Sequence, residues 1–168
     1  SVTNVSDSSF KPIVNIFSTD KAFAALKENG SIAAWGDSSY GGTAPNSVTN
    51  VSDSSFKPIV NVFPNKWGAF AALKEDGSIV AWGNQQRGGY YAQTGTGYVN
   101  IVSTLFAFAA LKDDGSIVAW GDSSNGGSGA PTTGTFVNIF STYYAFAALK
   151  TDGSITAWGS SSYGGTGA

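Results

Sequence analysis

The sequence of 168 residues contains no cysteine and no histidine. Without cysteine there is no disulfide, no thiolate nucleophile and no zinc site built on thiolates. Without histidine, the Ser-His-Asp and Cys-His arrangements of covalent hydrolases are excluded as well. We therefore expect a non-catalytic chain that needs no cofactor and no metal.

Charge and long apolar runs are also scarce. Only 12% of the residues are charged and the formal net charge is -2, whereas a surface that binds phosphates needs clustered Lys and Arg. No apolar run approaches the roughly 20 residues that span a bilayer. We expect no nucleic acid partner and no membrane insertion. Few Lys and Glu among many Ser, Thr, Asn and Gly favour an extracellular or cell-surface location.

What the sequence does contain is a repeat. The word Phe-Ala-Ala-Leu-Lys begins at Phe23, Phe70, Phe108 and Phe146, and a Trp-Gly follows each copy. The tryptophans of the four copies are Trp35, Trp82, Trp120 and Trp158, which lie 47, 38 and 38 positions apart. We predict one repeat domain, residues 1–168, with units at approximately 11–46, 57–97, 98–135 and 136–168.

Each unit predicts a β-hairpin with a further strand in front of it. Asn-Gly or Asp-Gly, as at Asn29-Gly30 and Asp76-Gly77, separates two apolar runs and supplies the positive φ that tight hairpin turns need. The strand in front is expected at residues 13–17, 59–63, 98–102 and 136–140. Helix is nearly excluded, because glycine and β-forming residues interrupt every window long enough to hold one.

The hairpin strands are apolar on both faces. Alternate residues of a strand point to opposite faces, so Ile79 and Ala81 share one face while Val80 and Trp82 share the other. Both faces must be covered, as in a stack of sheets. The expected fold is all-β, a β-propeller-like array of four short antiparallel blades with three to four strands each.

The segment Ala72 to Gly83, Ala-Leu-Lys-Glu-Asp-Gly-Ser-Ile-Val-Ala-Trp-Gly, resembles the repeat of the regulator of chromosome condensation family. The resemblance covers all four units and implies a β-propeller, usually of seven blades. The short unit is most similar to the bacterial branch that includes the propeller-type β-lactamase inhibitor protein, whose loops bind a protein partner. Eukaryotic members often carry His where this chain has Ala22-Phe23 and its equivalents. Nucleotide exchange and chromatin binding are therefore not carried over.

Four units are fewer than seven, and the N-terminal segment bears on how a ring is completed. Residues 1–15 are identical to residues 47–61, which follow the double glycine of the first unit. Residues 1–10 therefore either close the ring on the last blade of the same chain or complete the last blade of a neighbouring chain. The second arrangement gives a cyclic homo-oligomer or a head-to-tail filament. A further alternative is that the chain is part of a longer array.

Two sets of acidic residues come closest to a chemical site. Glu75-Asp76 and Asp113-Asp114 are adjacent carboxylates, and hydrolases use paired carboxylates. Asp37, Asp53 and Asp122 stand in Asp-Ser-Ser segments, whose oxygens are ligands of the kind that calcium prefers. We interpret both sets as turn residues bonded to the backbone, because adjacent turn carboxylates rarely converge and the spacing matches no calcium loop.

The slot in front of each Phe-Ala-Ala-Leu strand varies while the rest of the unit repeats. It contains Thr19-Asp20-Lys21, Asn65-Lys66-Trp67, Leu105-Phe106 and Tyr143-Tyr144. Repeats keep what builds the scaffold and vary what faces a partner. The predicted contact residues are Trp67, Leu105, Phe106, Tyr143 and Tyr144, with Arg87, Tyr90 and Tyr91 from a second variable loop. The alternative is that they fill a ring interior or a seam between chains.

Two functions compete. The first is an extracellular module that binds a protein partner, or another copy of itself, through these loop aromatics. The second is a lectin-like module with one shallow carbohydrate site per unit. The repeated tryptophans also invite a carbohydrate platform, but their recurrence at one position inside an apolar strand favours a structural role in the core.

Overall fold

In a computed structural model of the chain, the structure describes residues 11–90 and 92–166. These residues form four separate three-stranded antiparallel sheets, and in each sheet consecutive strands are neighbours. The strands are β1 (Ile13–Ser18), β2 (Ala22–Lys27), β3 (Ile32–Gly36), β4 (Ile59–Asn65), β5 (Ala69–Lys74), β6 (Ile79–Gly83), β7 (Tyr98–Ser103), β8 (Ala107–Lys112), β9 (Ile117–Gly121), β10 (Phe136–Ser141), β11 (Ala145–Lys150) and β12 (Ile155–Gly159). The predicted all-β array of four short blades is confirmed.

The second and third strands of each blade form the predicted hairpin. In the first blade, Phe23 pairs with Trp35 and Leu26 pairs with Ile32. The turn is closed by the amide of Gly30, which donates to the carbonyl of Lys27 at 2.9 Å, and Gly30 has φ +76°. A positive φ at this position is the reason that the sequence has glycine there.

The first strand of each blade carries a β-bulge near its start. The register shifts between Ile13 and Asn15, and the Asn15 side-chain oxygen accepts the amide of Ile16 at 2.9 Å. The bulged valine is about half exposed in all four blades; the exposed fractions of Val14, Val60, Val99 and Val137 are 58, 52, 53 and 51%. The exposure of this valine is therefore a property of the blade and not of its place in the array.

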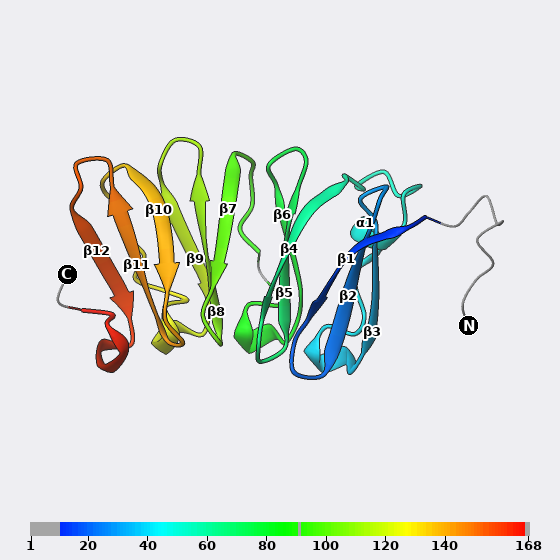
Figure 1. Cartoon of the computed structure of the whole chain (residues 1–168), viewed down its shortest axis with the longest axis horizontal. Helices are drawn as coiled ribbons and strands as arrows, with labels where there is room; N and C mark the ends of the chain where they lie inside the picture. Colours follow the sequence, from blue (N-terminus) through cyan, green and yellow to red (C-terminus); the bar gives the residue numbers. More distant parts are fainter. Residues whose placement is uncertain (1–10, 91, 167–168) are drawn as a thin grey trace.

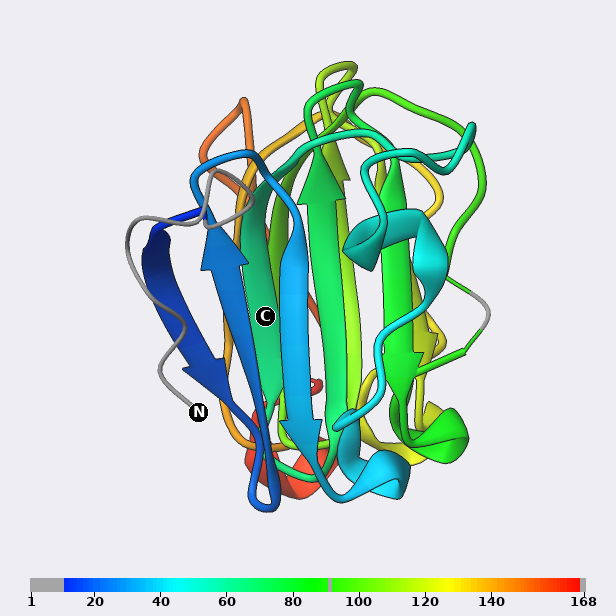
Figure 2. The same ribbon diagram turned by 90° about the vertical axis from the view of Figure 1, so that its right-hand side faces the viewer.

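The four blades stand side by side in a row, with the first blade at one end and the fourth at the other (Figure 1). Figure 2, which views the molecule from its right-hand side, shows the sheets stacked one behind another. Each blade has two different apolar faces. We call the face with the Phe and Trp of the hairpin, such as Phe70 and Trp82, the aromatic face. The opposite face, with two alanines and a leucine such as Ala22, Ala24 and Leu26, is the alanine face.

Every junction packs the aromatic face of one blade on the alanine face of the blade before it. At the first junction, Phe70 and Trp82 of the second blade share one buried cluster with Ala24, Leu26 and Ile32 of the first. The second and third junctions repeat this arrangement with the same residue types. The sequence-based prediction that strand faces are covered by neighbouring blades is thereby confirmed at the three internal junctions, whereas the outer faces of the first and fourth blades are exposed.

Two hydrogen bonds recur at each junction. The indole N–H of Trp82 donates to the carbonyl of Gly41 at 3.0 Å, and Trp120 and Trp158 donate to Gly88 and Gly126 at 3.1 Å each. The carbonyl of a hairpin-turn glycine accepts the first amide of the next blade: the pairs are Gly30 with Ile59, Gly77 with Tyr98 and Gly115 with Phe136, at 2.9 to 3.0 Å. Each blade is therefore joined to the next at both ends of its strands.

Short helical turns follow the third strands. They are η1 (Ser38–Tyr40), η2 (Gln85–Arg87), η3 (Ser123–Asn125) and η4 (Ser161–Tyr163). The first linker also holds α1 (Asn46–Thr49), whose Val48 is completely buried in the first junction. The longer first linker thus adds apolar packing to one junction.

The described chain is an open array. The first and fourth blades lie at opposite ends, so the four described blades do not close a ring (Figure 1). The expectation that residues 1–10 complete the last blade concerns a segment outside the described residues. In the described ranges no helix is long and apolar enough to cross a membrane.

Candidate functional site

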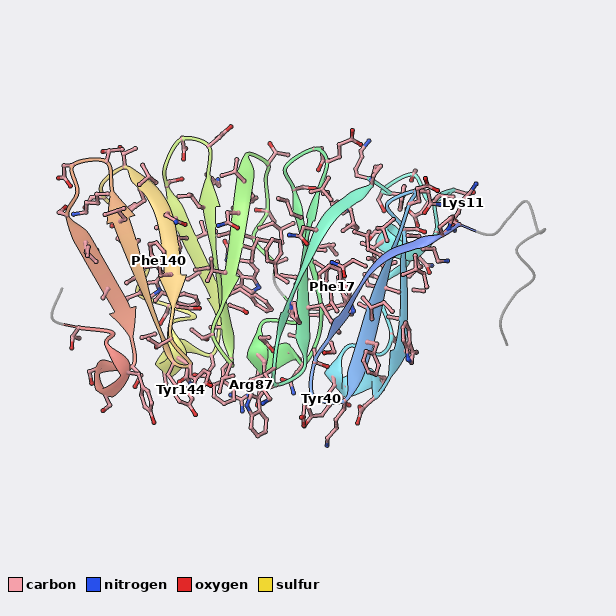
Figure 3. The ribbon with its side chains drawn as sticks, in the orientation of Figure 1. Lys11, Phe17, Tyr40, Arg87, Phe140 and Tyr144 are labelled. Carbon is pink, nitrogen blue, oxygen red and sulfur yellow. The ribbon has the colours of Figure 1, made fainter. Side chains whose placement is uncertain are left out.

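The variable slots lie along one edge of the array. Each slot connects the first strand of a blade to the second, at the end of the blade where the helical turns η1 to η4 also lie (Figure 1). Figure 3 labels Tyr40, Arg87 and Tyr144 along this edge. The repeat thus brings residues that are about 38 positions apart into one row.

The aromatic side chains of the slots stack across the blades. The ring centroids of Trp67 and Phe106 are 5.7 Å apart, and those of Phe106 and Tyr144 are 5.6 Å apart, with interplanar angles of 28° and 23°. Tyr163 of η4 lies 4.3 Å from Tyr144, and Tyr143 meets Tyr144 edge to face at 6.4 Å. We call these five residues the aromatic rim. A ring pair of this kind contributes about 0.5 to 1.5 kcal/mol beyond burial.

Much of the rim is accessible. Trp67, Tyr143 and Tyr163 are 45, 69 and 50% exposed, while Phe106 and Tyr144 are half-buried beneath their neighbours. The five rings therefore hold one another in place and still present an apolar surface outward.

Arg87 supports the rim from the second blade. Its guanidinium carbon lies 4.3 Å from the ring centroid of Phe106, and its Nη1 lies 3.0 Å from Oδ2 of Asp122. The carbonyl of Arg87 accepts the side-chain amide of Asn65 at 2.6 Å. Arg87 is thus fixed by a cation–π contact, an ion pair and a backbone bond, which orients Phe106.

The first blade replaces an aromatic slot with a cation. Lys21 occupies the slot, and its Nζ lies 4.6 Å from the ring centroid of Tyr40. Gly68 is next to Trp67 and passes close to the same ring, because a Cβ there would lie 2.7 Å from Cδ1 of Tyr40. The row of slots therefore begins with a contact between Lys21 and Tyr40 and ends with a group of tyrosines in the fourth blade.

A groove of about 530 Å³ runs beside the rim. It is lined by slot residues and by the ends of the first strands: Pro64, Lys66, Ser103, Thr104, Leu105, Ser141, Thr142 and Tyr143. Hydroxyl bonds tie its floor together, since Ser103 donates to the carbonyl of Pro64 at 3.0 Å and Ser141 donates to the carbonyl of Ser103 at 2.8 Å. The groove offers one ammonium group, several hydroxyls and an exposed phenol to a ligand.

The predicted contact residues fall into two groups. The structure gathers Trp67, Phe106, Tyr143, Tyr144 and Arg87 on one edge, and Leu105 lines the adjoining groove. Tyr90, which is 60% exposed, lines a different hollow with Ser38, Thr43 and Pro45. Tyr91 lies outside the described residues.

The repeated tryptophans occupy the junctions with one exception. Trp82, Trp120 and Trp158 are each 4% exposed. Trp35 has the same stacked partner, Phe23, at 5.3 Å, but is 46% exposed because no blade covers the aromatic face of the first blade.

The acidic turn residues are engaged in hydrogen bonds within their own turns. Oδ1 of Asp114 accepts the amide and the hydroxyl of Ser116 at 2.8 and 2.6 Å, and Asp76 and Asp152 make the same pair of bonds to Ser78 and Ser154. The serine hydroxyl, followed by its amide, holds the pKa of each of the three carboxyls below its usual range. These carboxylates stabilise hairpin turns.

The Asp-Ser-Ser segments behave in the same way. Asp37 and Asp122 accept the amides of Ser39 and Ser124 at the starts of η1 and η3. Across the described ranges no cluster of three or more His, Cys, Asp or Glu could hold a metal ion.

Sequence reasoning missed Tyr163 and Tyr40. A signal was present, because the third position of the helical turn varies from blade to blade as the slot does: Tyr40, Arg87, Asn125 and Tyr163. Only Arg87 of this set was among the predicted contact residues.

Comparison with known proteins places the fold. No protein-family model matches the sequence, and no curated protein matches it. Among solved structures, the chain is similar to the ectodomain of the receptor kinase CR4 of Physcomitrella patens, with a TM-score of 0.62 and 20% identity over 89% of this chain. It is similar to the ectodomain of the receptor kinase ACR4 of Arabidopsis thaliana, with a TM-score of 0.61 and 18% identity over 89%.

A third similar structure is Prp20p of Saccharomyces cerevisiae, also called yeast RCC1, with a TM-score of 0.59 and 22% identity over 88% of this chain. The chain spans 41, 50 and 43% of the length of these three proteins, in the order given. At this level of identity the likeness shows the fold, which is that of propeller repeats like those of the regulator of chromosome condensation.

Proposed function

We propose that this chain is a non-catalytic interaction module that binds a protein partner through the aromatic rim. The observation that carries the proposal is the continuous row of ring contacts from Trp67 through Phe106 and Tyr144 to Tyr163, built from positions that vary in an otherwise repetitive sequence. A second copy of the chain is the other protein that this surface is proposed to accept.

The rim has the physical properties of a protein-binding hot spot. Trp, Tyr and Arg are enriched among the residues that dominate binding energy at interfaces. Trp and Tyr bury a large area at a low cost in conformational entropy. Here the rings are already held by one another and by Arg87, so binding orders little that is not ordered beforehand. The groove beside the rim adds hydroxyls and Lys66 as polar partners.

Similar proteins support binding of a protein. A structure of yeast RCC1 is bound to Kap60, and the study of Prp20p concerns its binding to Gsp1p and histones. These partners belong to those proteins and are not proposed for this chain. What carries over is the use of propeller repeats as a binding surface.

The non-catalytic role is proposed from the state of the carboxylates. The turn aspartates Asp76, Asp114 and Asp152 already accept two hydrogen bonds each on one oxygen. A general acid needs a raised pKa, whereas these carboxyls have lowered pKa values.

We also propose an extracellular or cell-surface location. It rests on the polar, weakly charged composition and on the likeness to receptor-kinase ectodomains.

We propose on the sequence repeat that the chain belongs to the short-repeat bacterial branch. On the same basis we propose units at 11–46, 57–97, 98–135 and 136–168.

A glycan is the competing ligand, and the geometry favours it less. A lectin with one site per unit needs a free ring face in each blade. Here Phe106 lies between Trp67 and Tyr144 and shares its faces with both, while the first blade has Lys21 in the slot. The rim is therefore one shared surface and not a series of separate platforms.

Two parallel screens test the proposal. A displayed peptide library is selected against the immobilised chain, with a variant carrying Trp67→Ala and Tyr144→Ala as the counter-selection target, and a glycan array is probed with the same two proteins. We expect peptides that bind the chain and lose binding to the variant. Glycan binding with about one site per blade, and no rim-dependent peptide, would overturn it.

A further inference from the structure

The two ends of the array present the two halves of a junction that the chain builds three times internally. The free face of the first blade is an aromatic face, and the free face of the fourth blade is an alanine face. We propose that a second copy of this chain docks there, with the aromatic face of one copy against the alanine face of the other. This contact does not involve the aromatic rim and goes beyond the function proposed above.

The aromatic end is exposed where its counterparts are buried. Ile13, Ile16, Phe23 and Trp35 are 50, 53, 45 and 46% exposed, while the corresponding Ile59, Val62, Phe70 and Trp82 are 4, 2, 0 and 4% exposed. Phe23 and Trp35 already stack at 5.3 Å, as Phe70 and Trp82 do at 5.2 Å inside the array. The end is therefore preformed for a neighbouring blade.

The alanine end shows the same contrast. Ile155 is 53% exposed, whereas Ile32, Ile79 and Ile117 at the equivalent position are 2, 9 and 7% exposed. Phe140 is 55% exposed on the same blade (Figure 3). The counterparts of Phe140 at the internal junctions pack against the clusters there. Burying both ends removes several large apolar side chains from water, which favours docking.

The hydrogen-bond donors and acceptors of a junction are also divided between the two ends of the chain. At the internal junctions the indole of the following blade donates to the first residue of the double glycine in the preceding unit. The fourth such pair is Trp35 and the carbonyl of Gly164, which lie at opposite ends of one chain. The second recurring hydrogen bond joins a turn glycine to the first amide of the next blade. Its fourth pair is the carbonyl of Gly153 and the amide of Ile13, which also lie at opposite ends of one chain.

Glycine geometry agrees with an open site. A Cβ on Gly41, Gly88 or Gly126 would lie 2.5 to 2.8 Å from the phenylalanine ring of the next blade, whereas a Cβ on Gly164 meets nothing within 4 Å. Gly164 has φ +92°, like Gly88 at +91° and Gly126 at +92°. The receiving backbone thus has its docking conformation before the ring arrives.

The repeat indicates that the partner of these end faces is a second copy of the chain. The aromatic end face carries one charged residue, Lys27, on the same side of β2 as Phe23. The internal junctions accommodate a lysine at this position, because Lys74 is 9% exposed and its Nζ donates to the carbonyl of Ser55. Two copies related by a two-fold axis make two equal junctions and complete a ring of eight blades, within the range of four to eight that propellers typically have. Each chain spans about half of the propellers it resembles.

Mass and complementary variants test the docking. The chain alone is measured by sedimentation equilibrium from low to high micromolar concentration. We expect a limiting mass of twice 17.3 kDa. A mass of one copy throughout, or a mass that keeps growing with concentration, would overturn the closed pair.

The variants Phe23→Lys and Ile155→Glu each place a charge on one end face, and each should weaken pairing by at least about 100-fold. Both side chains are about half exposed in one copy, so the variants keep the fold, which circular dichroism checks. An equimolar mixture should regain pairs, because a pair of unlike variants contains one junction in which both faces are unsubstituted. Val99→Glu, at a position 53% exposed away from the ends, is the control that should pair normally.

The mixture separates this docking from the function proposed for the rim. Failure of the mixture to regain pairs would overturn head-to-tail docking and leave rim binding untouched. Loss of pairing in the Trp67→Ala and Tyr144→Ala variant, with pairing intact in Phe23→Lys, would overturn it as well and would assign self-association to the rim.

Discussion

The indole N–H of Trp82 donates a 3.0 Å hydrogen bond to the carbonyl of Gly41, 41 positions earlier in the chain. The bond depends on glycine, because Gly41 has φ +95° and a Cβ there would lie 2.5 Å from the ring of Phe70. The ring stack, the close backbone approach and the hydrogen bond therefore depend on one another at this junction. The double glycine and the Trp-Gly of the repeat are the sequence pattern that accompanies them.

Removing the indole N–H donor tests how much this hydrogen bond contributes to stability. Trp120→Phe keeps a ring at the second junction but leaves the carbonyl of Gly88 without its 3.1 Å donor. We expect a loss of about 1 to 3 kcal/mol in the free energy of unfolding. It is measured by urea titration at a concentration where the chain is monomeric. Trp35→Phe is the matched control and should cost less, because among residues 11–90 and 92–166 the Trp35 indole makes no such bond. Equal losses in the two variants would contradict the role of the bond.

The contact between glycine and phenylalanine is tested by two alanine variants. Gly88→Ala and Gly164→Ala introduce the same positive-φ strain, since φ is +91° and +92°. Only Gly88→Ala also places a Cβ 2.8 Å from Cδ2 of Phe108. We expect Gly88→Ala to lower the free energy of unfolding by about 1 to 3 kcal/mol more than Gly164→Ala under the same dilute conditions. A difference near zero would show that the ring moves aside without cost.

The scaffold was predictable because local signals and packing agreed. Asn-Gly and Asp-Gly set the turns, and the apolar residues at alternate positions on both faces, such as Val80 and Trp82 against Ile79 and Ala81, required covering blades. The helical turns were not foreseen, although Asp37 and Gly41 mark the start and end of η1. The open form of the described array could not be predicted either, because the copy of residues 47–61 at residues 1–15 allows closure within a chain or between chains.

The turn aspartates should make stability depend on acid. Hydrogen bonds from Ser78, Ser116 and Ser154 lower the pKa of Asp76, Asp114 and Asp152 in the folded chain. Their contribution is therefore fully present above the unfolded pKa of about 3.9 and is lost as pH falls through the lower folded pKa.

A triple Asp→Asn variant at positions 76, 114 and 152 separates charge from hydrogen bonding. In the first blade an asparagine already makes the same turn bonds without a charge, because Oδ1 of Asn29 accepts the amide and the hydroxyl of Ser31 at 3.1 and 2.7 Å. The thermal midpoint of the variant should fall less than that of the parent chain between about pH 5 and pH 2.5. Parallel curves would show that these carboxylates are not the source of acid sensitivity.

The site was predictable in position but not in form. Variation of the slot identified Trp67, Phe106 and Tyr144, yet only the stacking of blades showed that their rings contact one another across units. Tyr90 followed the same reasoning and lies at a different hollow. Sequence separates variable from repeated positions, whereas the direction of each side chain depends on the curvature of its loop.

The measurement that tests the account most directly is the affinity of a rim-selected peptide for the chain carrying both Trp67→Ala and Tyr144→Ala. We predict a loss of at least about 30-fold in affinity. The free energy of unfolding should fall by about 2 kcal/mol, which is about 0.5 kcal/mol for each of the four ring contacts removed, because Trp67 is 45% exposed and Tyr144 is half-buried. Val99→Ala, equally exposed but away from the rim, should bind as the parent does. An unchanged affinity in the double variant, or a collapse of stability that makes these rings part of the core, would contradict the rim as the binding surface.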